Sequence, residues 1–107
     1  MKGNQKAFTY HNKFGSTYSA IANLKMYGNG NTAITLTTAD SNEPIATVTV
    51  NTDLILPKDQ AVIKTYSENE GIDIELIKEG ILLENIGETL VGYCICPIYK
   101  VNLEYFR

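Results

Sequence analysis

The stretch STYSAIANLKMYGNGNTAITLTTADSNEPIATVTVN, residues 16–51, decides the fold. Inside it, two runs typical of β-strands flank YGNGN (27–31), whose glycines and asparagines supply the positive φ angles of a tight hairpin turn. The second run alternates Ile34 and Leu36 with threonines, and ADSNEP then turns the chain into a third alternating run. Three consecutive strands of this kind predict an antiparallel meander.

A second stretch, IKTYSENEGIDIELIKEG (63–80), predicts one helix. Ser67 and Glu70 have the S-x-x-E spacing of a capping box, in which the serine oxygen accepts from a first-turn amide and the glutamate reaches back to the serine amide. Apolar residues at helical spacing follow, and Gly80 is a natural end for the helix. We expect a helix over about residues 68–79.

The rest of the chain adds strands around this helix. QAVIKTY precedes it, Gly87 is expected to form a turn after it, and LVGYCICPIYKVNLEY (90–105) predicts a final long strand with Pro97 at an edge or a bulge. Together these features predict an α+β fold, in which the helix packs on a single antiparallel sheet of five to six strands arranged as a meander.

Length and composition limit the organisation of the chain. We expect a single domain over residues 1–107, with residues 1–15 as a loosely attached N-terminal segment. Hydrophobic residues make up 44% of the chain and charged residues 20%, as in ordered globular proteins. The sequence contains neither the roughly 20-residue apolar run of a membrane helix nor the apolar segment of a secretory signal, which predicts a cytoplasmic protein without membrane contact.

Charge is unevenly distributed along the chain. The part before Asp40 contains four lysines and no carboxylate, whereas twelve acidic residues face five basic ones from Asp40 onward. The net charge of −3 gives little of the counterion release that drives non-specific binding to nucleic acids, so direct DNA or RNA binding is disfavoured. The asymmetry predicts a surface with two differently charged faces.

Cys94 and Cys96 are the first candidates for chemistry. At an i, i+2 spacing in a strand their Cα atoms would lie about 6.5–7 Å apart, at or beyond the limit of disulfide geometry. Zinc normally needs four ligands, and the sequence offers only His11 besides these two thiols, so we predict no metal and no cofactor. We interpret both cysteines as core residues, while a Cys–His nucleophile pair formed by tertiary contact stays open.

Four carboxylates crowd the first half of the predicted helix. The helix dipole favours each of them there by a few tenths to about 1 kcal/mol, which already gives their position a structural explanation. No more than two or three can share one helix face, and no phosphate-binding loop accompanies them, so a magnesium or acid–base site is disfavoured. We interpret this exposed acidic segment as a partner-binding surface, with contacts at Tyr66, Glu68, Asn69, Glu70, Asp73 and Glu75.

Seven tyrosines in 107 residues suit either an ordinary half-buried sheet or the stacking of nucleotides. The second reading predicts a sponge protein that sequesters a signalling nucleotide through tyrosine stacking, asparagine and backbone donors, and Lys25 or Lys64. Long antiparallel strands can also pair edge to edge, which would give a symmetric homodimer.

Three segments carry a resemblance to a known family: YGNGNTAITLTTADSNEPIATVTVN (27–51), AVIKTYSENEGI (61–72) and GILLENIGETLVGYCICPIYKV (80–101). In these segments the chain resembles a small family of uncharacterised proteins from phages, plasmids and conjugative elements of gut-type bacteria. The similarity covers roughly residues 18 to 100, and YSENEG (66–71) is its most specific part. The resemblance implies no catalytic residue, and it implies an accessory role in a mobile element, such as countering host defence or regulating the element.

We therefore predict a non-enzymatic protein that binds and inhibits a host factor of an immune defence system, in the manner of anti-CRISPR and other anti-defence proteins. The nucleotide sponge is the first alternative. A small hydrolase that uses Cys94 or the carboxylates is a weaker one.

Overall fold

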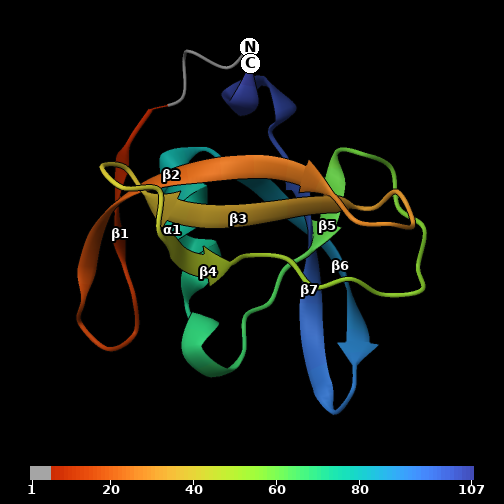
Figure 1. Ribbon diagram of the computed structural model, residues 1–107. Helices are drawn as coiled ribbons and strands as arrows, with labels where there is room; N and C mark the ends of the chain where they lie inside the picture. Colours follow the sequence, from red (N-terminus) through yellow and green to blue (C-terminus); the bar gives the residue numbers. More distant parts are fainter. Residues whose placement is uncertain (1–5) are drawn as a thin grey trace.

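The computed structural model describes residues 6–107, in which seven strands, one α-helix and two 3₁₀-helices form (Figure 1). In chain order these elements are β1 (Phe8–His11), β2 (Thr17–Met26), β3 (Thr32–Thr38), β4 (Pro44–Thr47), β5 (Gln60–Val62), η1 (Ser67–Asn69), α1 (Ile72–Glu79), β6 (Leu82–Val91), β7 (Cys94–Val101) and η2 (Leu103–Phe106).

All strand pairs are antiparallel. They form a four-stranded sheet in the order β1-β2-β3-β4 and a three-stranded sheet in the order β5-β7-β6. The prediction of an α+β fold with antiparallel strands and one helix is confirmed, and the predicted meander corresponds to β2, β3 and β4. The arrangement into sheets differs from the prediction, because the strands divide into two sheets instead of forming one of five to six strands.

Residues 48–50, which follow β4, join the two sheets. The amide of Val48 donates to the carbonyl of Ile34 in β3 at 2.9 Å, and the amide of Val50 donates to the carbonyl of Val62 in β5 at 3.0 Å. The amide of Lys64 donates in turn to the carbonyl of Val48 at 2.8 Å. This segment therefore shares backbone hydrogen bonds with both sheets, and the strands of the smaller sheet run steeply across those of the larger one (Figure 1).

β1 brings the start of the described chain into the fold. Phe8 pairs with Ala20 of β2, Tyr10 pairs with Tyr18, and both Phe8 and Tyr10 are buried. Residues 8–11 thus form an edge strand of the four-stranded sheet with two side chains in the core, whereas residues 1–15 were expected to form a loosely attached segment. The remainder of that expectation, for residues 1–5, lies outside the described residues.

The helical segment is interrupted where one continuous helix was predicted. α1 begins at Ile72, while Ser67–Asn69 form the separate helix η1. Gly71 stands between them with a φ of 85°, a left-handed conformation that cannot continue a right-handed helix. No side-chain hydrogen bond caps either helix, so the predicted capping box is not formed. Gly80 ends α1 as predicted: its amide donates to Ile77 and the next amide donates to Leu76, a Schellman motif.

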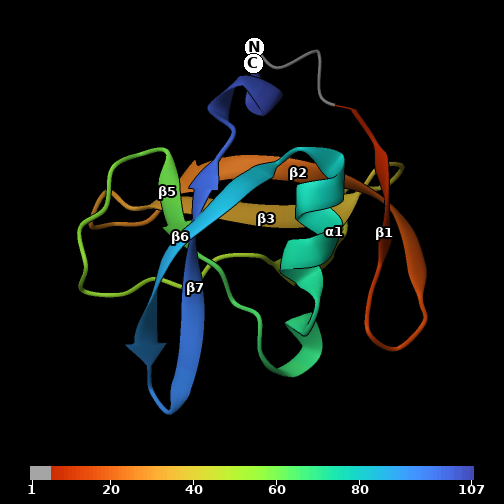
Figure 2. The same ribbon diagram turned by 180° about the vertical axis from the view of Figure 1, so that it is seen from behind.

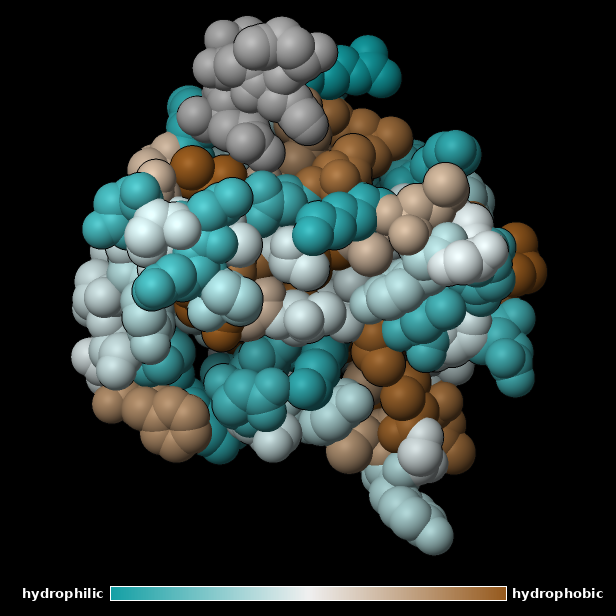
Figure 3. Space-filling view, viewed as in Figure 1, coloured by the Kyte–Doolittle hydropathy of each residue, from teal (hydrophilic) through white to brown (hydrophobic). Residues whose placement is uncertain are grey.

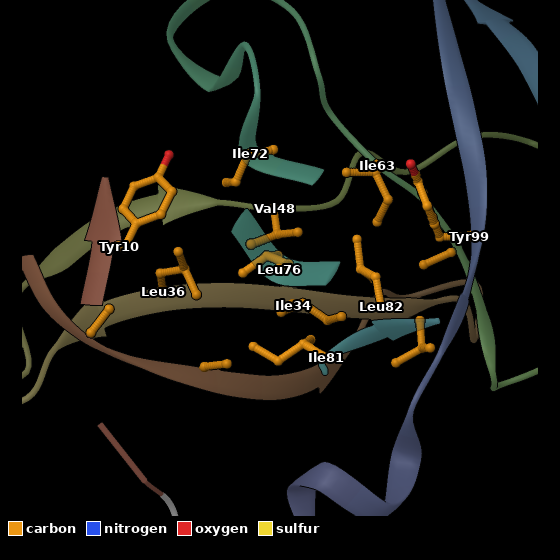
Figure 4. Packing of buried hydrophobic residues seen from close by; sticks show 14 of the residues in the cluster. Tyr10, Ile34, Leu36, Val48, Ile63, Ile72, Leu76, Ile81, Leu82 and Tyr99 are labelled. Atoms are coloured by element: carbon orange, nitrogen blue, oxygen red, sulfur yellow. The ribbon is translucent and has the colours of Figure 1, made fainter. Parts of the chain in front are cut away.

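α1 lies between β1 and β6, the two outer strands that it contacts (Figure 2). Its Ile72 and Leu76 side chains pack in a core that both sheets share (Figure 4). The largest fully buried apolar side chains of this core are Ile34, Leu36, Val48, Ile63, Ile72, Leu76, Ile81, Leu82 and Val101. None of the helices among residues 6–107 has the length and apolar character needed to cross a membrane.

The last part of the chain folds as the hairpin β6–β7, where a turn at Gly87 and one long strand were expected. Gly87 lies inside β6 opposite Ile98, and the register of β6 is irregular just before it. The reversal occurs instead at Gly92, whose φ is 61°, and at Tyr93. Figure 1 shows that the turn of this hairpin projects beyond the body of the molecule.

Candidate functional site

The predicted acidic segment lies on η1 and α1, and its exposed carboxylates are paired with lysines of the same chain. Lys13 Nζ donates to Glu70 Oε1 at 3.2 Å, and Lys64 Nζ donates to Glu68 Oε2 at 2.8 Å. The glutamate side chains remain largely accessible, with 72% of Glu70 and 55% of Glu68 exposed. Both glutamates can therefore contact a binding partner, but each would first have to give up its ion pair with a lysine of the same chain.

The two further carboxylates hold α1 to the sheets. Glu75 Oε1 accepts from the backbone amide of His11 and lies 3.3 Å from His11 Nδ1, while Oε2 lies 3.8 Å from Lys78 Nζ. Asp73 Oδ2 accepts from the hydroxyl of Tyr99 at 2.9 Å. These contacts connect the helix to β1 on one side and β7 on the other, so the two carboxylates contribute to the fold as well as to the surface.

Glu68, Lys64 and Tyr66 form one cluster. The hydrogen bond from Lys64, together with hydrogen bonds from the backbone amide of Glu68 itself and from Ser67, lowers the pKa of Glu68 to about 2. The carboxylate is therefore ionised at every physiological pH and is a poor general acid. The Lys64 ammonium also lies 5.4 Å from the centre of the Tyr66 ring, within the range of a cation–π contact.

Asn69 is the member of the predicted contact set that the structure places in the interior. Only 1% of this residue is exposed, and its Nδ2 donates to the carbonyl of Thr47 in β4 at 2.7 Å. Its Oδ1 is buried and has no hydrogen-bond partner among the described residues. A buried acceptor without a hydrogen bond lowers the stability of the fold by about 1–3 kcal/mol.

A recess of about 120 Å³ adjoins Asn69, between the β1–β2 turn and η1 (Figure 3, the dark hollow left of centre). β4 forms one of its walls through Ile45 and Ala46. The other lining residues are Tyr10, Asn12, Phe14, Tyr18, Glu68 and Asn69. The recess is therefore lined by aromatic, acidic and amide residues.

The predicted chemical groups are not brought together. Cys94 and Cys96 are free thiols; Cys96 is buried, and burial raises the pKa of its thiol. His11 contacts Glu75 instead of a cysteine. Across residues 6–107, no three His, Cys, Asp or Glu side chains are grouped so that they could hold a metal ion.

The residues suggested for nucleotide stacking are also separated. Two shallow clefts, of about 420 and 350 Å³, are both lined by Lys25, but no tyrosine of the described chain lines either one. Lys64 does lie against a tyrosine, Tyr66, but its ammonium is bound by Glu68. The structure thus brings together neither Lys25 and a tyrosine nor a free Lys64 and a tyrosine.

Sequence reasoning missed an apolar surface on the projecting hairpin. Leu90 and Ile95 are paired across β6 and β7, and they are 66% and 62% exposed. Tyr93 is fully exposed at the turn, and Glu88 lies on the same side of β6 as Leu90 and forms no ion pair with any described residue. We call Glu88, Leu90, Tyr93 and Ile95 the hairpin patch.

Apolar side chains indeed gather along this hairpin above its projecting turn (Figure 3, lower right). The sequence signal for it was Gly92-Tyr93, which separates two alternating apolar runs and marks a hairpin turn. With the turn at that position, Cys96 falls on the inner face and Leu90 and Ile95 fall on the outer face.

Comparisons of the chain with protein-family models, with curated proteins and with solved structures found no match.

Proposed function

We propose that this protein is a non-enzymatic accessory protein of a phage or another mobile element, which binds a host defence protein and inhibits it by covering a functional surface. The observation that carries the proposal is the hairpin patch, in which Leu90, Tyr93 and Ile95 expose most of their side chains on a projecting turn. Neighbouring large apolar and aromatic side chains that face solvent are characteristic of protein-binding surfaces.

Charge supports a basic partner. Glu88 lies beside Leu90 without an ion pair among the described residues, and η1, which carries Glu68, lies at the same end of the molecule as the hairpin turn (Figures 1 and 2). An apolar patch that carries a carboxylate without an ion pair in the described chain complements a surface with lysine and arginine, such as a nucleic-acid-binding channel of a defence protein. Such complementarity speeds and directs association.

The family resemblance of residues 18–100 is the reason for proposing a mobile element and, with it, the cytoplasm of the bacterial host. The same resemblance would suit a protein that regulates the element. Inhibition of a defence protein is preferred because the hairpin patch suits a large protein surface.

A phage-challenge experiment tests this proposal. Cells that carry a chosen defence system express the wild-type protein, the double variant Leu90→Lys with Ile95→Lys, or the control Ile55→Lys, which changes another highly exposed apolar residue. We expect wild type and control to restore plating of the restricted phage. Each apolar anchor contributes about 1–2 kcal/mol to a protein interface, so the double variant should bind at least about tenfold more weakly and should not restore plating.

A second pair of changes, Glu68→Lys with Glu70→Lys, separates the two ends of the proposed surface. Loss of activity in this variant would support contacts in the acidic segment predicted from the sequence, whereas full activity would confine the contact to the hairpin patch. If the wild-type protein restores plating against none of a broad panel of defence systems, inhibition of defence is wrong.

Native mass spectrometry of the protein purified from its host addresses the alternatives. A bound small molecule of nucleotide mass would contradict the proposal and favour the sponge. A host protein that co-purifies with wild type and Ile55→Lys, but not with the hairpin double variant, would support it. The same spectrum tests the predicted homodimer.

A further inference from the structure

The outer edge of β6 is an open edge of the smaller sheet. In that sheet β6 pairs only with β7, which lies between β5 and β6. On its other side β6 has no neighbouring strand among residues 6–107, as both views of the ribbon show (Figures 1 and 2). An open edge of this kind can accept an additional strand from another chain.

The direction of the backbone groups along this edge follows from Pro97. Its carbonyl accepts from the amide of Ile63 at 2.9 Å, so it points toward the β5 side and away from β6. Pro97 is paired with Glu88, and the two residues of an antiparallel pair point their backbone groups either both toward each other or both away. The N–H and C=O groups of Glu88, and those of Leu90 two residues later, therefore point outward. No hydrogen bond within residues 6–107 occupies these four groups.

The edge is regular only where it belongs to the hairpin patch. From Gly87 to Val91 each residue of β6 pairs with β7 without a register shift, whereas two shifts occur between Leu82 and Gly87. Such irregularities twist an edge strand and hinder the addition of another strand. A new strand can therefore continue the sheet along residues 87–91, beside the exposed side chain of Leu90.

Charge argues against a second copy of this chain as the added strand. Glu88 is exposed and forms no ion pair with any described residue. An antiparallel pair of two copies would put both Glu88 side chains on the same face of neighbouring strands, where like charges repel. The short stretch 87–91 also offers less area than the roughly 800 Å² per partner of a standard stable interface. A basic segment of a larger protein meets neither obstacle.

We propose that residues 87–91 take up an extended segment of the host protein as an additional antiparallel strand. This inference rests on the proposed function, because it specifies how the partner binds at the hairpin patch. The four outward backbone groups of Glu88 and Leu90 form hydrogen bonds with the segment. In an antiparallel pair the residue opposite Leu90 comes two positions before the residue opposite Glu88. The segment therefore contains an apolar residue, then any residue, then lysine or arginine.

A short peptide that carries this motif tests the added strand. The probe is acetyl-Thr-Val-Thr-Lys-Thr-amide, and the same peptide with glutamate in place of lysine is its control. Nuclear magnetic resonance of the isotope-labelled protein follows the titration. We expect saturating probe to shift the amides of Glu88 and Leu90 and to slow their hydrogen exchange, whereas the amide of Thr89 already faces Cys96 in β7. A probe that leaves the exchange of Glu88 and Leu90 unchanged would overturn the proposal.

N-methylated peptides separate backbone pairing from contacts of side chains. Methyl groups on the nitrogens of the valine and the lysine remove the two donors that face β6, which should weaken binding at least about tenfold. A methyl group on the central threonine lies on the outward side of the added strand and should change the affinity by less than about twofold. Equal losses in the two peptides would contradict backbone pairing.

Reversal of the charge at Glu88 tests the motif. The wild-type protein should prefer the lysine peptide by about two- to fivefold, as expected for an exposed ion pair, and Glu88→Lys should prefer the glutamate peptide. Glu43→Lys makes the same change of charge in the loop between β3 and β4 and should keep the wild-type preference. A preference for lysine that persists in Glu88→Lys would show that the motif is wrong.

The phage challenge distinguishes this inference from the proposed function. Glu88→Gln removes only the charge and should still restore plating, whereas Glu88→Pro also removes the outward N–H and should not. Thermal unfolding checks that both variants fold, and the methylated peptides replace them if Glu88→Pro does not. If folded Glu88→Pro restores plating while Leu90→Lys with Ile95→Lys does not, the proposed function stands and the added strand is wrong.

Two further outcomes are separable. If the wild-type protein restores no plating but the probe protects Glu88 and Leu90, the proposed function fails and the edge still accepts a strand. If the amides of Glu88 and Leu90 become protected in the free protein as its concentration rises, a second copy occupies the edge and the inference is wrong.

Discussion

The hydroxyl of Tyr99 donates a hydrogen bond of 2.9 Å to Oδ2 of Asp73, which ties the middle strand of the smaller sheet to the first turn of the only α-helix in the described chain. Tyr99 is almost completely buried, and Asp73 is only partly accessible. Asp73, which the sequence analysis predicted to contact a partner at the surface, therefore also holds the helix to the sheet.

Replacing Tyr99 by phenylalanine should lower the free energy of unfolding by about 1–3 kcal/mol, because hydrogen bonds to charged groups are the stronger ones. Urea denaturation followed by circular dichroism measures the change. Tyr93→Phe removes the same hydroxyl from a fully exposed side chain and should change stability by less than about 0.5 kcal/mol. Equal effects of the two substitutions would show that the contact with Asp73 does not contribute.

Stability should fall at alkaline pH. Burial, with the hydrogen bond to Asp73, raises the pKa of Tyr99 to about 12 from an ordinary value of 10.0, and burial also raises the pKa values of Tyr10 and Tyr105. The folded state keeps protons that the unfolded state releases above pH 10, so this contribution is complete below pH 10 and is lost as the pH rises toward 12.

Denaturant midpoints measured across this range, with tyrosinate absorbance as a second signal, test the alkaline effect. Tyr99→Phe should make the decline with pH shallower. If the midpoint of the wild-type protein stays constant from pH 9 to about pH 12, the three tyrosines titrate normally in the folded state.

Gly71→Ala should destabilise the protein by about 1–2 kcal/mol. The cost comes from backbone conformation alone, since φ is 85° and an added Cβ would meet no atom within 4 Å. Gly28→Ala is the matched control, because its surroundings are equally open and its φ lies outside the left-handed region. Thermal unfolding of both variants gives the comparison, and a stability loss at Gly28 as large as that at Gly71 would be inconsistent with a backbone cause.

Thiol chemistry should distinguish the two cysteines. Burial raises the pKa of Cys96, whereas Cys94 is partly accessible, so alkylation of the native protein should modify Cys94 first. Mass spectrometry of peptides after brief treatment with iodoacetamide gives the order. In denaturant the two rates should become similar, and preferential labelling of native Cys96 would show that β7 opens readily.

The fold was predictable where the sequence contained strong local signals. YGNGN and the alternation around Ile34 and Leu36 gave the meander, and Gly80 gave the end of the helix, because turn residues and side-chain periodicity act over a few neighbours. β1 was missed because four residues carry too little periodicity. The division into two sheets was missed because it depends on residues 48–50, which form backbone hydrogen bonds with Ile34 on one side and with Val62 and Lys64 on the other. Such long-range pairing leaves no local sequence pattern.

The site was less predictable because its properties depend on long-range contacts. The spacing of Ser67 and Glu70 favoured a capping box, yet Gly71 has a left-handed conformation and α1 begins only at Ile72. Asn69 is buried by a contact with Thr47, which lies 22 positions away. The exposure of Leu90 and Ile95 depended on placing one turn at Gly92. The pairing of Lys13 with Glu70 joins residues 57 positions apart, which no local pattern contains.

The backbone bonds that residues 48–50 share with β3 and β5 have a consequence for cooperativity. Neither sheet can complete its hydrogen bonds at this border while the other is unfolded, because one strand segment serves both. Amide hydrogens from the two sheets should therefore exchange through the same global opening, and the protein should melt in one transition. A binding partner that grips only the β6–β7 hairpin would then protect the distant meander from unfolding as well.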